Sequence, residues 1–216
     1  MEIKKYYLAP TALVPNSPLP LLHYVGAIAP GDDAKVRFYD LLRANNWELQ
    51  WLVRYGPTQE AHYHSGIHEC MAVLSGEATI RFGAADTTPD LEPSTNGGGK
   101  EPGGLEIQAH AGDVFLIPAG VCHKTFNPIP NPGFERLTPG DGHSVDAADV
   151  RKFVSEVELS GFTMMGCYPR GHGTWDFLTG GEGNYEKAWS VPIPERDPIL
   201  GTSPDGILGT WRWPNH

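Results

Sequence analysis

The sequence predicts an all-β protein, an antiparallel sandwich or barrel preceded by one helix and followed by an irregular tail. Glycine (26) and proline (20) are abundant and charged residues make up only 19%, a mix that favours short strands and tight turns. Between residues 48 and 168, short apolar or alternating segments follow one another, separated by turn residues. The length of 216 residues suits one domain, 1–216, because single β-barrels often reach this size.

Residues 1–31 are rich in proline and predict an extended arm with one strand, at 21–25. A helix is expected over 32–46, because Asp32 or Asp33 can cap it and Val36, Tyr39 and Leu42 recur at about one turn. A second, short helix is expected within 146–157. Alternation and apolar runs predict strands at 48–55, 62–64, 69–74, 78–82, 105–110, 114–117, 121–126 and 161–168.

Two segments outside these strands differ in character. Residues 84–104 are polar and glycine-rich, and loops of this length are either functional covers or disordered insertions. We favour a flexible, disordered insertion. The tail from residue 169 loses periodicity but keeps Trp175, Trp189, Trp211 and Trp213, whose aromatic area is expected to pack on the body.

Charge and cysteine content narrow the function. The formal net charge of −10 opposes binding to nucleic acid or to anionic membranes. Cys70, Cys122 and Cys167 are odd in number and lack CxxC spacing, which favours buried, reduced thiols. No apolar stretch matches a signal peptide or a membrane span, so we expect a cytoplasmic protein.

Three histidines and one glutamate form the candidate site. His62 and His64 are two residues apart and therefore face the same way on a strand. Glu69 begins the next strand and can face this pair, and His123 comes from a later hairpin. Turn residues frame both stretches: Gly56, Gly112, Pro118 and Gly120. Imidazole and carboxylate together suit a divalent transition metal, so iron, manganese, nickel, cobalt and zinc all remain open.

The sequence gives weaker evidence for a role of neighbouring residues in the site. His68 is an alternative ligand, although adjacent strand residues face opposite ways. Tyr63 and Cys122 should point away from the barrel and serve in packing. Residues expected to line the cavity or close its floor are Met71, Val73, Ile80, Phe82, Val121 and Thr125. Polar groups that could anchor a ligand, although each fits the surface or rim better, are Arg81, Glu106, Gln108, Tyr168 and Arg170. Asp176, which follows Trp175 in the tail, could reach the cavity mouth. Trp47 and Trp51 are expected in the body, and the remaining histidines at 110, 143, 172 and 216 show no partner pattern.

Two long motifs resemble those of the cupin superfamily. Gly56, five residues, His62-x-His64, four residues, Glu69, six residues and Gly76 matches the first motif, at 56–76. The second motif, at 112–127, is matched by Gly112, five residues, Pro118-x-Gly120, two residues, His123, three residues and Asn127. The run 112–124, the strand end 167–171 and the tail 192–198 are similar to the YjlB-like branch of single-domain cupins. That resemblance implies a double-stranded β-helix, or jelly-roll barrel, with the metal on His62, His64, Glu69 and His123.

The resemblance leaves the reaction open. The first hypothesis is a metal-dependent enzyme of dioxygenase, isomerase or decarboxylase type, acting on a small organic molecule that chelates through two oxygens. The second is a non-catalytic module that binds or senses a small molecule. Metal-free isomerisation by paired side chains is a third, and it leaves Glu69 unexplained. Cupins commonly dimerise by sheet extension, so we expect a homodimer, with residues 6–25 crossing to the partner.

Overall fold

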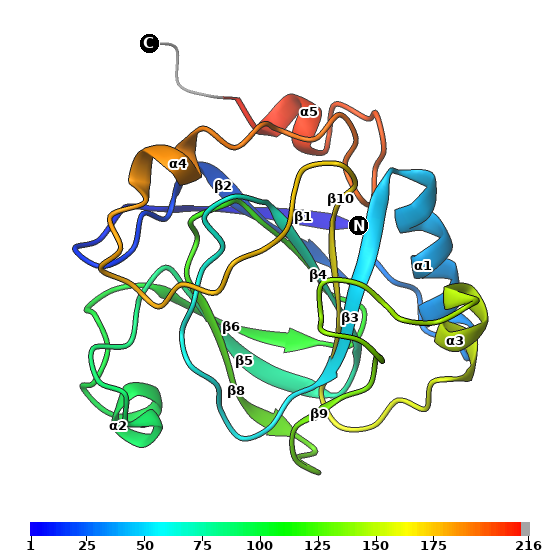
Figure 1. Ribbon diagram of the computed structural model, residues 1–216, viewed down its shortest axis with the longest axis horizontal. Coiled ribbons are helices and arrows are strands. Elements are labelled where there is room, and N and C mark those ends of the chain that lie inside the picture. Colours follow the sequence, from blue (N-terminus) through cyan, green and yellow to red (C-terminus); the bar gives the residue numbers. More distant parts are fainter. Residues whose placement is uncertain (213–216) are drawn as a thin grey trace.

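The computed structural model describes residues 1–212 and consists of two antiparallel sheets that close into a jelly-roll barrel (Figure 1). The larger sheet has the strand order β1 (Glu2–Leu8), β2 (Ser17–Val25), β7 (Val114–Ile117), β4 (Glu69–Ser75), β10 (Thr163–Pro169), β3 (Trp47–Arg54), β9 (Glu135–Arg136). The smaller sheet has the order β6 (Leu105–His110), β5 (Glu77–Phe82), β8 (His123–Ile129). The all-β jelly roll expected from the sequence is confirmed.

The larger sheet is covered on both faces, which explains the wholly apolar strand β7. Phe115 and Ile117 pack inside the barrel with residues of the smaller sheet. Val114 and Leu116 alternate with them and pack on the outer face, against a second apolar cluster that includes residues of α1 (Ala34–Ala44). The interior cluster contains Met71, Val73, Ile80, Phe82 and Val121, which places the side chains of these residues inside the barrel.

Helices α1 and α3 (Val150–Glu156) lie together against the outer face of the larger sheet, at the right of Figure 1. Both helices fall within the ranges expected from the sequence. The side chain of Asp149 caps α3 by accepting a hydrogen bond from the backbone N–H of Lys152. The cap of α1 is at Asp33, whose side chain makes no capping bond.

The N-terminal arm contains two strands where the sequence suggested one. In strand β1, Ile3, Tyr6 and Leu8 are half-buried and the other residues are exposed, and the strand pairs with β2 from Glu2 to Leu8. An edge strand needs only one apolar face, and the charges Glu2, Lys4 and Lys5 hide its alternation. Residues 6–25 thus lie in the chain's own sheet, where β2 also pairs with β7.

The segment 84–104 is folded, which corrects the expectation of a disordered insertion. It contains α2 (Leu91–Asn96), and Asp90 caps that helix through Glu92 N–H. Buried Arg81 donates hydrogen bonds to the carbonyl oxygens of Ser94 and Thr95, both at 2.9 Å. These bonds tie the segment to the outer face of β5, so its polar composition reflects hydrogen bonding and not disorder.

The C-terminal tail packs on the body through its tryptophans and carries two short helices, α4 (Tyr185–Trp189) and α5 (Ile207–Thr210). Trp189 donates its indole N–H to Asn16 O at 3.1 Å and Trp211 donates to Pro20 O at 2.9 Å. The tail is therefore less irregular than expected. Trp213 and His216 lie outside the described residues.

Three further features bear on expectations from the sequence. Residues 62–64 form isolated bridges, His62 with His123 and Tyr63 with Leu178, in place of the expected strand. The three cysteines are buried free thiols among the described residues. Within residues 1–212, no helix combines the length and apolar character needed to cross a membrane.

Candidate metal centre

The two motifs are joined through the backbones of their own histidines. His62 and His123 exchange two backbone hydrogen bonds, of 3.1 and 2.8 Å. Gly120 N–H donates to His64 O at 2.8 Å. Gly120 has φ +87°, and a Cβ there would lie 2.5 Å from Asn16 O, so only glycine fits this close approach. The turn at Gly120 thereby holds the segment of His62 and His64 against the segment of His123.

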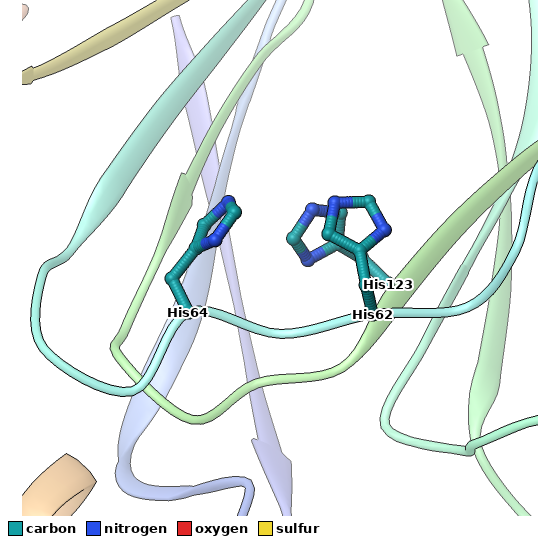
Figure 2. A group of neighbouring side chains, drawn as sticks. All are labelled: His62, His64 and His123. Atoms are coloured by element: carbon teal, nitrogen blue, oxygen red, sulfur yellow. The ribbon is translucent and has the colours of Figure 1, made fainter. Parts of the chain in front are cut away.

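The three imidazole rings converge inside the barrel, as Figure 2 shows. One ring nitrogen of each histidine lies within 4.8 Å of the others, and all three side chains are buried. The Nδ1 atoms face backbone carbonyls: His62 faces Glu60 O at 3.2 Å, His123 faces Val121 O at 3.2 Å, and His64 faces Asp176 O. A carbonyl can only accept, so Nδ1 carries the proton and Nε2 offers a lone pair to the centre.

Glu69 supplies a carboxylate to the same point. Its Oε2 atom lies 3.4 Å from His64 Nε2 and 3.3 Å from His123 Nε2. It is buried and has no hydrogen-bond partner among the described residues. The other oxygen, Oε1, accepts a hydrogen bond from Tyr168 OH at 2.5 Å, and Tyr168 OH in turn accepts from Trp51 Nε1 at 3.1 Å. The unpartnered oxygen is thus the one aimed at the histidines.

The charges of these groups favour cation binding. Burial and the neighbouring His123 and His64 rings hold the pKa of His62 well below its ordinary value, and burial also lowers the pKa of His123. Burial alone would raise the pKa of Glu69, but His64, His123 and Tyr168 outweigh it and lower that pKa to about 2. Burial opposes the imidazolium of His64, yet Glu69 outweighs burial and raises the pKa of His64. One carboxylate and two neutral imidazoles therefore face each other near neutral pH.

This donor set fits a divalent transition metal. A buried carboxylate oxygen that has no hydrogen-bond partner within residues 1–212 and lies beside imidazole nitrogens is costly unless a cation compensates it. His68, the alternative ligand, lies elsewhere: its Nδ1 accepts from Ala119 N–H at 2.9 Å and its ring packs on Trp211. All four predicted ligands are thus brought together and the alternative is not.

A cavity of about 210 Å³ opens above the four side chains. Met71 and Tyr168 line it, which agrees with the expected role of Met71 and gives Tyr168 an interior place that the sequence favoured less. Aromatic residues that the sequence did not place at the cavity complete the walls. Those residues are Trp51, Tyr55, Phe134, Trp175 and Phe177.

The segment 171–183 brings two of these aromatic rings over the histidines. Phe177 stacks on His62 with centroids 4.0 Å apart, and Trp175 lies 5.6 Å from the His64 ring. The Asp176 carboxylate accepts the N–H of Ser65 at 2.6 Å, and the Tyr63–Leu178 bridge holds the far end. Asp176 therefore contacts His64 through its backbone carbonyl and does not line the cavity. Asp176 follows the last strand, β10, in a segment without periodicity, so the sequence pattern did not indicate this position.

The other predicted anchors lie outside the cavity. Arg81 and Glu106 bond each other at 3.1 Å on the outer face of the smaller sheet, and Gln108 donates to Thr79 there. Arg170 lines a separate polar hollow. Tyr63 and Cys122 pack in a third apolar cluster, as expected. Thr125 is buried, and its hydroxyl has no hydrogen-bond partner among residues 1–212.

One histidine without a predicted role supports the site. His143 stacks on Trp175 with ring centroids 4.1 Å apart, and Trp175 donates its indole N–H to Gly142 O at 3.1 Å. His110 instead lies near Glu77 at 3.5 Å on the surface. The rim of the cavity is thus held by contacts between segments far apart in sequence.

Comparison with known proteins finds a relative along nearly the whole chain. A scan against protein-family models finds no match. The uncharacterised protein YjlB of Bacillus subtilis (strain 168) is 27% identical over 215 residues, which cover 97% of each chain.

Two solved structures are similar to the chain only at low TM-scores. A cupin-like protein from Thermotoga maritima has a TM-score of 0.33 at 13% identity, with 88% of this chain and 97% of that chain covered. Procruciferin, an 11S globulin from Brassica napus, has a TM-score of 0.31 at 12% identity, with 65% of this chain and 24% of its own covered. TM-scores this low leave the fold to be defined by the strand topology itself. The chain is thus similar to YjlB along nearly its whole length, and its two motifs are joined in a jelly-roll barrel.

Proposed function

We propose that the protein is a metal-dependent enzyme of dioxygenase, isomerase or decarboxylase type, which acts on a small organic molecule that chelates through two oxygens. His62, His64, Glu69 and His123 would hold one divalent transition metal. The observation that carries the proposal is the buried Glu69 Oε2, which has no hydrogen-bond partner among the described residues and lies within 3.4 Å of two histidine nitrogens. A bound cation would compensate that charge.

Such a metal would polarise a substrate oxygen or bind dioxygen at positions that the four protein ligands leave free. The chain's own residues set the surroundings. Tyr168 holds Glu69 through its hydroxyl group, and the three backbone carbonyls hold the imidazoles in one tautomer. The aromatic walls exclude water from the chelating atoms of the substrate, which strengthens their interaction with the ion.

The test is elemental analysis of protein purified without chelator, followed by an oxygen-uptake screen on chelating acids and diketones. We expect about one metal ion per chain and turnover of at least one compound. Replacing His62 by alanine should abolish both metal content and turnover. The matched control is His110→Ala, because His110 is exposed on the surface and lies near Glu77.

The outcomes separate the alternatives. Bound metal with ligand-induced thermal shifts but no turnover would favour a non-catalytic binding or sensing cupin. Turnover that survives complete metal removal would refute the metal-dependent mechanism and favour metal-free isomerisation.

A further inference from the structure

The mouth of the cavity differs chemically from its floor. The floor carries the four ligands, and the mouth is formed by apolar rings together with Gln59, Arg136 and Asp141. Phe134 and Phe177, at 67% and 49% exposure, are the exposed phenylalanines of the described chain, and both line this cavity. Large exposed apolar side chains beside a pocket mark a surface that a ligand covers.

Arg136 is the cation of this mouth. It lies on β9, opposite Val53 of β3, which also lines the cavity. Its guanidinium has no hydrogen bond or ion pair within residues 1–212. The carboxylate of the neighbouring residue, Glu135, forms an ion pair with Arg54 at 2.7 Å. Arg136 is therefore free to pair with a negative group that enters the cavity.

The opposing charge is Asp141. Its carboxylate accepts the N–H of His143 at 2.8 Å, and the bond lowers the pKa of Asp141, so this group remains anionic. It makes no ion pair with Arg136 in the described structure. The next residue, Gly142, lies close to both Arg136 and Trp175: a Cβ there would be 3.6 Å from Arg136 Nη1 and 3.3 Å from Trp175 Cζ2. The guanidinium thus stands beside the aromatic wall.

We infer that the ligand of this cavity is an organic acid with a flat apolar body, whose carboxylate pairs with Arg136 at the mouth. The body would lie between Phe134, Trp175 and Phe177, and the chelating oxygens would reach toward the histidines. This inference rests on the proposed metal function for its inner contacts, whereas the contacts with Arg136 and the aromatic rings are independent of a metal. Phe177 would face both the ligand and His62, on which it already stacks.

The test compares two probes that share a ring and a diketone, one anionic and one neutral. The anionic probe is benzoylpyruvate and the neutral probe is benzoylacetone. Binding to zinc-loaded protein is measured by calorimetry, after zinc binding itself has been verified with a competing chelator dye. We expect Arg136→Met to weaken benzoylpyruvate about tenfold, a typical loss for one charge-assisted contact, and to leave benzoylacetone unchanged.

Two further variants test the sign of the ligand's charge and the contribution of the aromatic rings to binding. Asp141→Asn should tighten benzoylpyruvate, because it removes the opposing charge, and should not change benzoylacetone. Phe177→Ala should weaken both probes, while Leu208→Ala, an apolar surface change on α5, should weaken neither. Acetylpyruvate, which lacks the ring, should bind more weakly than benzoylpyruvate.

The failures are distinguishable. If zinc does not bind, the proposed metal function fails, and the dependence on Arg136 is then read from benzoylpyruvate binding to the metal-free protein. If zinc binds but benzoylpyruvate fails to bind, or binds equally to the Arg136→Met protein, the inference about the ligand is wrong. It is likewise wrong if Arg136→Met tightens binding and Asp141→Asn weakens it, because that pattern belongs to a cationic ligand.

Discussion

At the residue scale, Glu69 is the group whose position most needs an explanation. It is buried among three histidines, and one of its oxygens has no hydrogen-bond partner within residues 1–212. Tyr168 and Trp51 fix the other oxygen through a chain of two hydrogen bonds. Trp51 can lie there only because residue 166 is glycine, since a Cβ at Gly166 would be 1.8 Å from Trp51 Cε2. The absence of a side chain at Gly166 thus makes room for Trp51, which bonds Tyr168, and Tyr168 in turn holds the Glu69 carboxylate.

Replacing Glu69 by glutamine keeps the shape and removes the charge. We expect metal affinity to fall by about ten- to a hundredfold or more, because loss of outer-shell groups alone has effects of that size. Competition with a fluorescent zinc chelator measures the change. The matched control is Glu158→Gln, which alters an exposed carboxylate outside the site. Equal affinities of the Glu69→Gln and unmodified proteins would exclude Glu69 as a ligand.

At the element scale, buried charges hold irregular segments onto the barrel. Lys124 on β8 is fully buried, and its Nζ donates to both oxygens of Asp86 and to Ser94 Oγ, at 2.9 to 3.1 Å. Arg81 on β5 reaches the carbonyls of the same segment. From sequence, Arg81 fitted the surface better than the cavity, because strand parity tells the two faces of a strand apart but does not reveal what covers the outer face.

Lys124→Met should leave Asp86 buried beside Arg81 without its main partner. We expect a loss of about 3–5 kcal/mol in the free energy of unfolding, as for other broken buried ion pairs. Urea denaturation measures it, and limited proteolysis should show faster cleavage within 84–104. The control Lys100→Met removes a more exposed amine, 3.3 Å from Glu106, and should cost at most about 1 kcal/mol. Equal stability of the two variants would contradict the clamping role of Lys124.

A second element-scale prediction concerns the turn between β6 and β7. The Asp113 side chain accepts Gly26 N–H at 2.9 Å and His110 N–H at 3.0 Å, and lies 3.4 Å from His23 Nε2. Burial alone would raise the pKa of Asp113, but His23 and these N–H groups outweigh it and lower that pKa. The folded state therefore favours the carboxylate. Its contribution to stability is present above the unfolded pKa of about 3.9 and is lost as pH falls through the folded value.

Asp113→Asn tests that contribution. At pH 7 the variant should be about 1–3 kcal/mol less stable, the usual worth of hydrogen bonds to a charged group. The difference should shrink as pH falls below 4, because the unmodified protein then loses the same interaction. Urea midpoints from pH 7 to pH 2 measure this, with Asp205→Asn as an exposed control. A difference that stays constant across this range would contradict the ionic role of Asp113.

At the scale of the whole molecule, sequence reasoning reached the barrel and the four converging side chains, because both depend on local rules. Strand alternation put His62 and His64 on one face, and Gly120 allowed the close approach behind His123. The aromatic walls of the cavity could not be predicted from the sequence. Phe134, Trp175 and Phe177 come from segments without periodicity, and only tertiary contacts such as the Tyr63–Leu178 bridge bring them to the histidines.

Association is a second whole-molecule property. Strand β1 is an end strand of the larger sheet, and the expected homodimer would form there by sheet extension. Light scattering at micromolar concentration should give twice the chain mass. Tyr7 on β1 is 72% exposed, so Tyr7→Lys should shift the protein toward monomer, whereas Leu208→Lys should not. A monomer of the unmodified protein at these concentrations would contradict the dimer.

The central claim is that three imidazoles and one carboxylate, drawn from two remote segments, bind one ion. A crystal of the metal-loaded protein, with anomalous diffraction collected at the metal edge, tests it most directly. We expect one peak about 2.0–2.2 Å from Nε2 of His62, His64 and His123 and from Glu69 Oε2. A peak elsewhere, or none despite added metal, would contradict the account.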